Sequence, residues 1–231
     1  MLPKSQTLLE KKLGYSFDDP TLLRTALTHR SYLNENRDMR EHNERLEFLG
    51  DAVLELVVTD FLYHSMPDTP EGKMTSIRAA LVRKENLARA ARDLSLGDFL
   101  YLSKGEEQTG GRENDYILAN SVESVLGATY LEHGLKYCRK FIEKNILNRL
   151  DLILQHKLHR DSKSYLQEMA QEKLQLTPTY RILSEEGPDH EKIFEAGVYF
   201  GEMLQGQGKG GSKRAAELKA AEVSLRQLGW E

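Results

Sequence analysis

The sequence predicts an all-α domain followed by a small α+β domain with the element order α-β-β-β-α. Three observations lead to this prediction. Apolar residues recur at helical spacing through almost all of residues 2–154. A polar stretch, residues 155–163, then interrupts the periodicity. Beyond it, three short runs containing β-branched and aromatic residues lie between two helical patterns.

The composition is that of an ordinary globular protein. The chain has 231 residues, of which 39% are hydrophobic and 29% charged, and its net charge of -4 gives no bulk basic signature of nucleic-acid binding. The single cysteine, Cys138, excludes internal disulfides and suits a reducing compartment. No stretch approaches the ~18 apolar residues of a membrane span, and the first residues lack the apolar core of a signal peptide. We expect a cytoplasmic protein without a membrane segment.

Helix signals follow one another through the first domain. Residues 18–29 open with Asp-Pro, which favours entry into a helix, and residues 75–94 form a long amphipathic stretch. Residues 114–134 end at Gly134, where a glycine cap is expected. Residues 136–154 read as a further amphipathic helix. Strand-like alternation is almost absent, so we place an all-α domain at residues 1–154 and a linker at 155–161.

An acidic stripe marks one of these helices, residues 42–58. The segment is apolar around most of its circumference, which predicts burial. Glu44, Glu47, Asp51 and Glu55 nevertheless fall within about a quarter-turn at ~3.6 residues per turn. Buried carboxylates are costly unless they are paired, protonated or bound to a metal. Solvated or salt-bridged acids are the ordinary alternative.

A second helical pattern supplies a polar pair three residues apart, Asn120 and Glu123, among apolar neighbours. If the two helices pack together, their oxygen atoms converge. Mg²⁺ and Mn²⁺ prefer such ligands, and Mg²⁺ keeps several of its waters. This chemistry suits the hydrolysis of a phosphodiester.

Four segments resemble the ribonuclease III family, in the same order along the chain: "ALTHRSY", "NERLEFLGDAVLEL", "EGKMTSIRAALV" and "GGRENDYILANSVESVLGATYLEHG". The resemblance implies an all-α endonuclease domain that forms a homodimer and cuts double-stranded RNA with a divalent metal. Each subunit would cut one strand, giving 5′-phosphate and 3′-hydroxyl ends with a short 3′ overhang. The domain order resembles the bacterial form, which implies processing of rRNA and other structured RNAs.

The family's site residues map onto acids of this chain. Glu47, Asp51 and Glu123 match metal ligands, and Asp51 and Glu123 carry the catalytic role. Glu44 and Glu71 match acids that line the cleavage site and assist there. Glu55 has no family role, so we expect a salt bridge or solvent contact for it.

Asn120 departs from the family pattern, in which aspartate is common at this position. Its amide oxygen can still bind metal, but the missing charge should weaken Mg²⁺ binding. A tolerated natural variant, an engineered substrate trap and a lineage that has lost cleavage all fit the substitution. We favour an active or weakly active natural variant; the rival is a non-catalytic double-stranded-RNA-binding homologue. A phosphohydrolase acting on small substrates is disfavoured by the second domain.

The second domain, residues 162–231, resembles a double-stranded-RNA-binding domain. Helical patterns at 164–175 and 212–229 flank the strand-like runs 177–186, 192–200 and 202–208. Such domains grip duplex RNA by shape across two minor grooves and the phosphates between them.

Seven residues of this domain match the family's RNA contacts: Gln167, Gln171, His190, Lys209, Ser212, Lys213 and Arg214. Ser212 is a natural N-cap, and cations just after it oppose the helix dipole unless an anion binds there. From Arg160 onward ten Lys and Arg face twelve Asp and Glu, so binding requires a local patch. Gly211 stands where the family usually has another lysine. "GQGKGGSK" is not a nucleotide-binding P-loop. It lacks the order Gly-Lys-Ser/Thr, and it follows the third strand of an antiparallel sheet, not the first strand of a βαβ unit.

Overall fold

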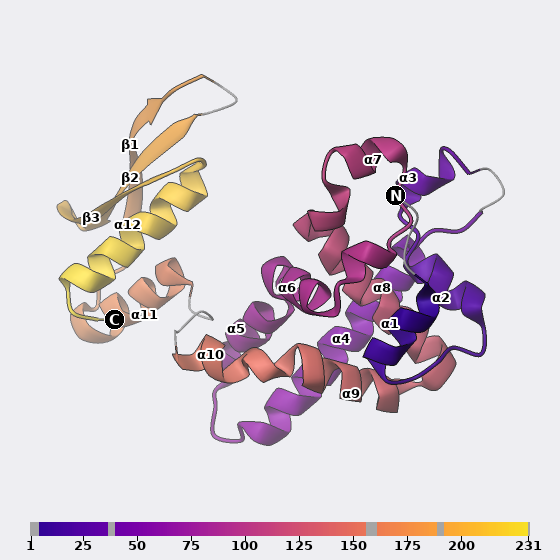
Figure 1. Cartoon of the computed structure of the whole chain (residues 1–231). Coiled ribbons are helices and arrows are strands. Elements are labelled where there is room, and N and C mark those ends of the chain that lie inside the picture. Colours follow the sequence, from indigo (N-terminus) through magenta and orange to yellow (C-terminus); the bar gives the residue numbers. More distant parts are fainter. Residues whose placement is uncertain (1–4, 37–39, 156–160, 189–191, 231) are drawn as a thin grey trace. The chain divides into compact units, whose positions relative to one another are not determined.

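The computed structural model divides the chain into two compact units, Met1–His159 and Arg160–Glu231, which we call the helical domain and the C-terminal domain (Figure 1). The structure describes residues 5–36, 40–155, 161–188 and 192–230. Helices build the first unit, and helices with a three-stranded sheet build the second, which confirms the predicted fold class.

The described part of the helical domain contains helices and three short 3₁₀ turns. The helices are α1 Gln6–Leu13, α2 Pro20–Ala26, α3 Arg30–Leu33, α4 Glu44–Ser65, α5 Glu71–Val82, α6 Lys84–Leu94, α7 Lys104–Gln108, α8 Asp115–His133, α9 Leu135–Asn145 and α10 Leu150–Gln155. The 3₁₀ turns are η1 Leu96–Phe99, η2 Gly111–Glu113 and η3 Leu147–Arg149.

Local sequence signals account for several helix ends. Asp19 caps α2 by accepting a hydrogen bond from the backbone N–H of Thr21 at 2.9 Å. Gly134 ends α8 with a φ of 72°, a conformation that favours glycine. The amphipathic stretch 75–94 is not one helix, because the extended backbone of Arg83 separates α5 from α6. The stretch 136–154 is likewise divided, by η3.

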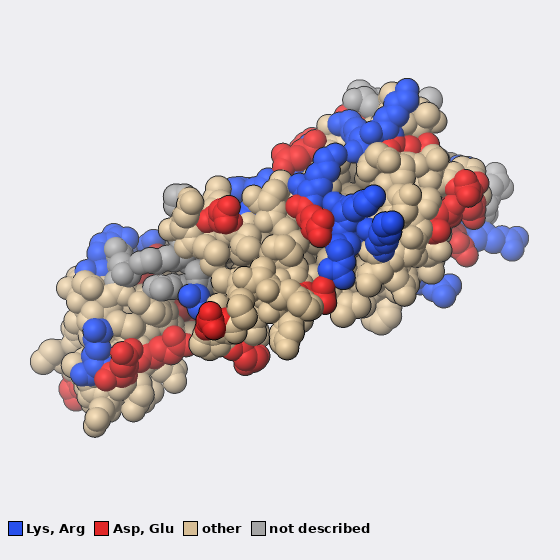
Figure 2. Space-filling view, turned by 90° about the horizontal axis from the view of Figure 1, so that it is seen from below, with Lys and Arg blue, Asp and Glu red and all other residues tan. Residues whose placement is uncertain are grey.

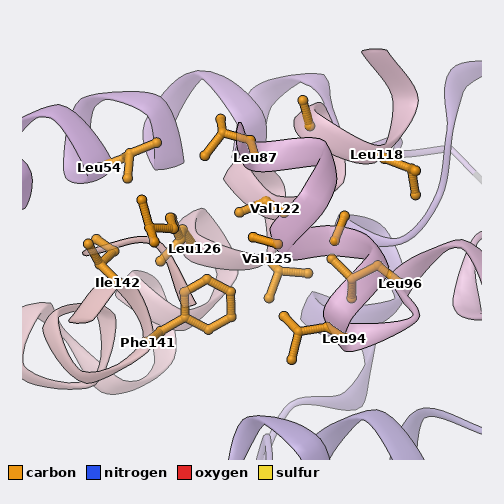
Figure 3. Close-up of a cluster of buried hydrophobic side chains, with 14 of the residues drawn as sticks. Leu54, Leu87, Leu94, Leu96, Leu118, Val122, Val125, Leu126, Phe141 and Ile142 are labelled. Carbon is orange, nitrogen blue, oxygen red and sulfur yellow. The ribbon is translucent and has the colours of Figure 1, made fainter. Parts of the chain in front are cut away.

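Helix α8 lies at the centre of the core. Most of its residues from Ile117 to Thr129 are buried, including small polar ones that hydrogen-bond to backbone carbonyls. In Figure 3, Val122 and Leu126 of this helix lie among Leu54 of α4 and Phe141 of α9. A helix buried on nearly all sides holds its few polar side chains in fixed positions.

Helices α4 and α8 cross with their backbones in direct contact. A Cβ atom on Gly50 of α4 would overlap the backbone carbonyl of Glu123, and one on Gly127 of α8 would overlap that of Leu46. Hydrogen is therefore the only side chain that fits at either glycine. This crossing sets the distance between the acidic residues on the two helices.

The expectation that the segment 42–58 is buried around its circumference is wrong. Leu46, Val53 and Val57 face the core, but Phe48 is 81% exposed and Leu56 is 57% exposed. An apolar surface of this kind on a helix commonly marks an interaction site. None of the described helices has the length and apolar composition needed to span a membrane.

The C-terminal domain has the predicted α-β-β-β-α order. Its elements are α11 Ser162–Leu174, β1 Thr179–Glu186, β2 Ile193–Phe200, β3 Met203–Gly210 and α12 Lys213–Gln227. The antiparallel sheet has the order β1-β2-β3. Leu166 and Ala170 of α11 pack with Val198 of β2 and Ala220 of α12 in a small core.

Three glycines of "GQGKGGSK", Gly206, Gly208 and Gly210, let α12 pack closely against β3. A Cβ on Gly206 would lie 2.7 Å from the carbonyl oxygen of Ala220, and one on Gly208 would overlap the backbone nitrogen of the same residue. Strand β3 therefore lets α12 lie directly on the sheet. Close packing of α12 on β3 therefore accounts for these glycines, and no phosphate-binding loop is needed to explain them.

Replacing Gly50 by alanine should separate α4 from α8 and lower the free energy of unfolding by about 3 kcal/mol, because backbone atoms cannot move aside cheaply. Urea denaturation followed at the transition of the helical domain measures the loss. Gly105→Ala in α7 is the control, since a Cβ there meets nothing within 4 Å. It should change stability by less than about 1 kcal/mol. Equal losses in both variants would contradict the crossing argument.

Candidate functional site

The crossing of α4 and α8 brings acidic side chains of both helices together. Gly50 touches the backbone of Glu123, and Asp51 and Glu47 lie one and three positions from Gly50 on α4. The charges of Asp51 and Glu47 both act on the Glu123 carboxyl. The structure thus joins three of the acids that the sequence singled out.

Glu123 carries the strongest electrostatic signal of this group. Burial, followed by the negative charges of Asp51 and Glu47, raises the pKa of its carboxyl to about 8. Among the described residues, no hydrogen-bond donor or cation is paired with this carboxyl. The ionised form of a half-buried carboxyl is destabilised when its charged neighbours are all carboxylates, and a bound cation would stabilise it.

Glu47 interacts with Asn120, the residue that departs from the family pattern. Burial and the charge of Glu44 raise the pKa of Glu47, and a hydrogen bond from Asn120 opposes this rise. Since a carboxylate only accepts hydrogen bonds, the Asn120 amide N–H₂ is the donor. Asn120 therefore reaches the acidic group, and in this structure it acts as a donor to a carboxylate.

Glu44 lies at the edge of the group. It occupies the first turn of α4, where the helix dipole favours an acid. Its carboxylate lies 3.4 Å from the guanidinium of Arg30 and 3.9 Å from Nδ1 of His42. Through its charge it still acts on Glu47.

The structure does not bring Glu71 into this group. Glu71 begins α5, accepts a hydrogen bond from Thr75 Oγ1 at 2.9 Å and lines a separate cavity of about 180 Å³ with Tyr63. Its assisting role stays a prediction. Glu55 forms an ion pair with Arg78 at 2.9 Å, as expected for a residue without a family role.

The donor set at the crossing fits a hard divalent cation. Carboxylates of Glu47, Asp51 and Glu123 and the amide of Asn120 offer oxygen atoms, with no sulfur or imidazole among them. Among the residues that the structure describes, no three His, Cys, Asp or Glu side chains converge closely enough to hold a metal ion. Mg²⁺ does not require such a cage, because one or two carboxylates and several waters are its usual ligands.

In the C-terminal domain, the structure brings two predicted RNA contacts together. Gln167 of α11 and Arg214 of α12 line the same hollow, of about 480 Å³. Gln171 is exposed one turn farther along α11. Ser212 caps α12 by accepting a hydrogen bond from the N–H of Ala215 at 3.2 Å. His190 lies outside the described residues.

The predicted lysines have acidic partners that the sequence analysis missed. Lys213 lies 3.1 Å from Glu185, and Lys209 lies 3.6 Å from Glu195. Spacing along the chain gives no signal of these pairs, since strand pairing places Lys209 opposite Glu195 and the start of α12 brings Lys213 to Glu185. Basic and acidic side chains also lie beside one another on the face seen in Figure 2.

Comparison with known proteins assigns each domain. The protein-family model described as Ribonuclease-III-like matches residues 19–150, and the family model for the double-stranded RNA binding motif matches residues 162–228. The chain is 48% identical to Ribonuclease 3 of Pelotomaculum thermopropionicum, covering 95% of this chain and 91% of that protein. It is 44% identical to Ribonuclease 3 of Caldanaerobacter subterraneus, covering 96% and 98%.

Two solved structures of the ribonuclease III nuclease domain from Campylobacter jejuni are also similar. One has a TM-score of 0.58 at 41% identity and covers 63% of this chain and 96% of that chain. The other has a TM-score of 0.57 at 43% identity, covers 61% and 98%, and concerns a region involved in dimer formation. Fold and site together define a nuclease joined to an RNA-binding module. The chain belongs to the ribonuclease III family, whose members are hydrolases of RNA.

The raised pKa of Glu123 predicts a pH-dependent stability of the metal-free protein. The folded state holds this proton up to about pH 8, whereas the unfolded chain releases it near 4.5, so this contribution is present below 4.5 and lost as pH rises to 8. Glu123→Gln cannot lose it. In EDTA, the stability of this variant relative to the unmodified chain should therefore rise between pH 5 and pH 9. The expected rise is on the order of 1–2 kcal/mol, allowing for partial solvation.

Urea denaturation across this pH range measures the difference. Glu55→Gln is the matched control on α4, because the carboxylate it removes is paired with Arg78. Its offset from the unmodified chain should stay constant with pH. The same pH trend in both variants would show that the acidic group is not the cause.

Proposed function

We propose that the chain is a divalent-metal-dependent endoribonuclease that cuts double-stranded RNA to 5′-phosphate and 3′-hydroxyl ends with short 3′ overhangs. One observation carries the proposal: the uncompensated acids at the α4–α8 crossing share a chain with a double-stranded RNA binding motif. Membership of the family supports the same reaction. We further propose rRNA and other structured RNAs as substrates and the cytoplasm as the location.

Glu47, Asp51, Asn120 and Glu123 would hold Mg²⁺, or Mn²⁺ in its place, one or two of them directly and the others through its bound waters. When bound, the ion supplies Lewis-acid stabilisation of the phosphodiester and lowers the pKa of water. Glu123 can keep a proton at neutral pH in the metal-free protein and would give it up to solvent on binding a cation. Asn120 steadies Glu47 through its amide N–H₂. Glu44 would assist at the margin of the cleavage site, whereas Glu71 lines a separate cavity and its assisting role stays a prediction.

The exposed apolar face of α4 supports a homodimer. Phe48 and Leu131, which is 58% exposed, border a hollow of about 1110 Å³. An apolar side chain beside an open hollow on the same face suits a two-fold interface, in which each copy offers both parts. The related Campylobacter jejuni domain, with its dimer-forming region, supports a second copy of this chain as the occupant.

The cleavage test uses the full chain with a long RNA duplex and Mg²⁺ or Mn²⁺. Glu123→Ala should lower the cleavage rate by about 100-fold or more, because it removes a predicted ligand. Asn120→Asp should cleave at lower Mg²⁺ concentrations, since it adds the missing charge. Rates are measured from the appearance of labelled products.

Glu55→Ala is the matched control on α4 and should cleave at close to the unmodified rate, because Glu55 is engaged with Arg78. If the unmodified chain binds the duplex but never cuts it with either metal, the enzyme proposal fails. A non-catalytic RNA-binding role would then replace it.

Phe48→Glu should convert the dimer to a monomer at ~10 µM protein, since it places a charge on the exposed apolar face of α4. Sedimentation velocity gives the mass, and circular dichroism checks that the helices remain. Leu176→Glu is the control, because Leu176 is 42% exposed in the C-terminal domain and belongs to no predicted interface. A dimer that persists in Phe48→Glu would exclude this face.

A further inference from the structure

Glu185 of β1 lies beside Lys213, one of the residues predicted to contact RNA. In the sheet register, Glu185 is opposite Phe194 of β2, and Phe194 is opposite Gly210 of β3. Lys213 follows shortly after Gly210 as the first residue of α12. Its side chain therefore has to cross the sheet to reach Glu185.

The contacts of Lys213 follow this path. Its ammonium lies 5.7 Å from the centre of the Phe194 ring and 3.1 Å from Oε1 of Glu185. The other carboxylate oxygen of Glu185 lies 3.6 Å from the ammonium of Lys192. One carboxylate thus engages two lysines, and Lys213 remains 60% exposed at its side chain.

This arrangement changes the argument made from the sequence. A cation in the first turn of a helix opposes the helix dipole, which suggested that Lys213 requires a phosphate. In the free protein, the Glu185 carboxylate already supplies the negative charge. The hydrogen bond from Lys213 and the charges of both lysines keep the pKa of Glu185 below its usual value, so it stays ionised at neutral pH.

We propose that Glu185 sets the affinity of this domain for duplex RNA by competing with RNA phosphate for Lys213. The inference rests on the proposed binding of double-stranded RNA. To contact a phosphate, Lys213 has to leave Glu185, and the released carboxylate then faces a polyanion. Exposed ion pairs are weak, so the competition reduces affinity and does not block binding.

The chain supports this role through its charge distribution. The C-terminal domain has more acids than bases, so each lysine released to phosphate matters. Lys209 is engaged in the same way, by Glu195 at 3.6 Å. Arg214 lines the hollow shared with Gln167 and supplies a contact that does not depend on Glu185. The domain can therefore bind before Lys213 changes partner.

The test compares Glu185→Gln with the unmodified full chain. Binding to a short RNA duplex is followed by fluorescence anisotropy in EDTA, which prevents cleavage. Glu185→Gln should tighten binding by about three- to tenfold near 0.05 M salt, with a steeper dependence on salt, and the gain should shrink as salt screens the charges.

Glu222→Gln is the matched control. It makes the same change of charge on α12, where Glu222 pairs with Lys219 at 2.7 Å. Its effect should stay below about twofold. Equal tightening by Glu222→Gln and Glu185→Gln would mean that net charge alone is responsible, and would overturn the inference.

A second comparison isolates Lys213. In a Lys213→Ala background, Glu185→Gln should produce a smaller gain than in the unmodified chain, because the lysine for which Glu185 and RNA phosphate compete is gone. An undiminished gain would overturn the proposed competition. If instead the unmodified chain shows no duplex binding, and Lys213→Ala/Arg214→Ala changes nothing, the RNA-binding proposal itself fails and the inference with it.

Discussion

The direct contact between the backbones of α4 and α8 is the constraint on which the helical domain depends. It exists because Gly50 and Gly127 carry no side chain at the crossing. Close contact brings the acids beside Gly50 near Glu123, whose own carboxyl is half-buried, so their charges raise its pKa. The same rigidity that packs the core therefore prevents the acids from separating. Asn120 eases this crowding, since a neutral amide that donates to Glu47 replaces what would be a further negative charge.

Local signals made much of the fold predictable. The caps at Asp19, Gly134 and Ser212 depend only on neighbouring residues, and each occurs where the sequence places it. Helical periodicity likewise indicated that Glu47 and Asp51 share a face of one helix. These features were accessible because they arise within one element or one turn. The resemblance to ribonuclease III extended the prediction across elements.

Features that depend on distant parts of the chain were not predictable from local pattern. The pattern of α4 indicated burial, yet Phe48 and Leu56 are exposed, because a single copy of the chain does not cover them. Glu71 shares the acidic character of the site, but the path of α5 carries it to another cavity. The pair of Lys213 and Glu185 arises from the strand register together with the position where α12 begins, and sequence spacing gives no signal of it.

Both domains offer charge to a ligand, but their side chains dictate different responses. Glu47 and Glu123 have shorter side chains than lysine, are half-buried and lie on packed helices. They therefore reach no Lys or Arg among the residues that the structure describes. Binding of a metal ion from solution would relieve the repulsion among these carboxylates. Lys213 is long and exposed, and it reaches a carboxylate of its own domain. A cation bound in the helical domain would thus neutralise carboxylates that have no cationic partner, whereas RNA bound to the C-terminal domain would have to replace Glu185 as the partner of Lys213.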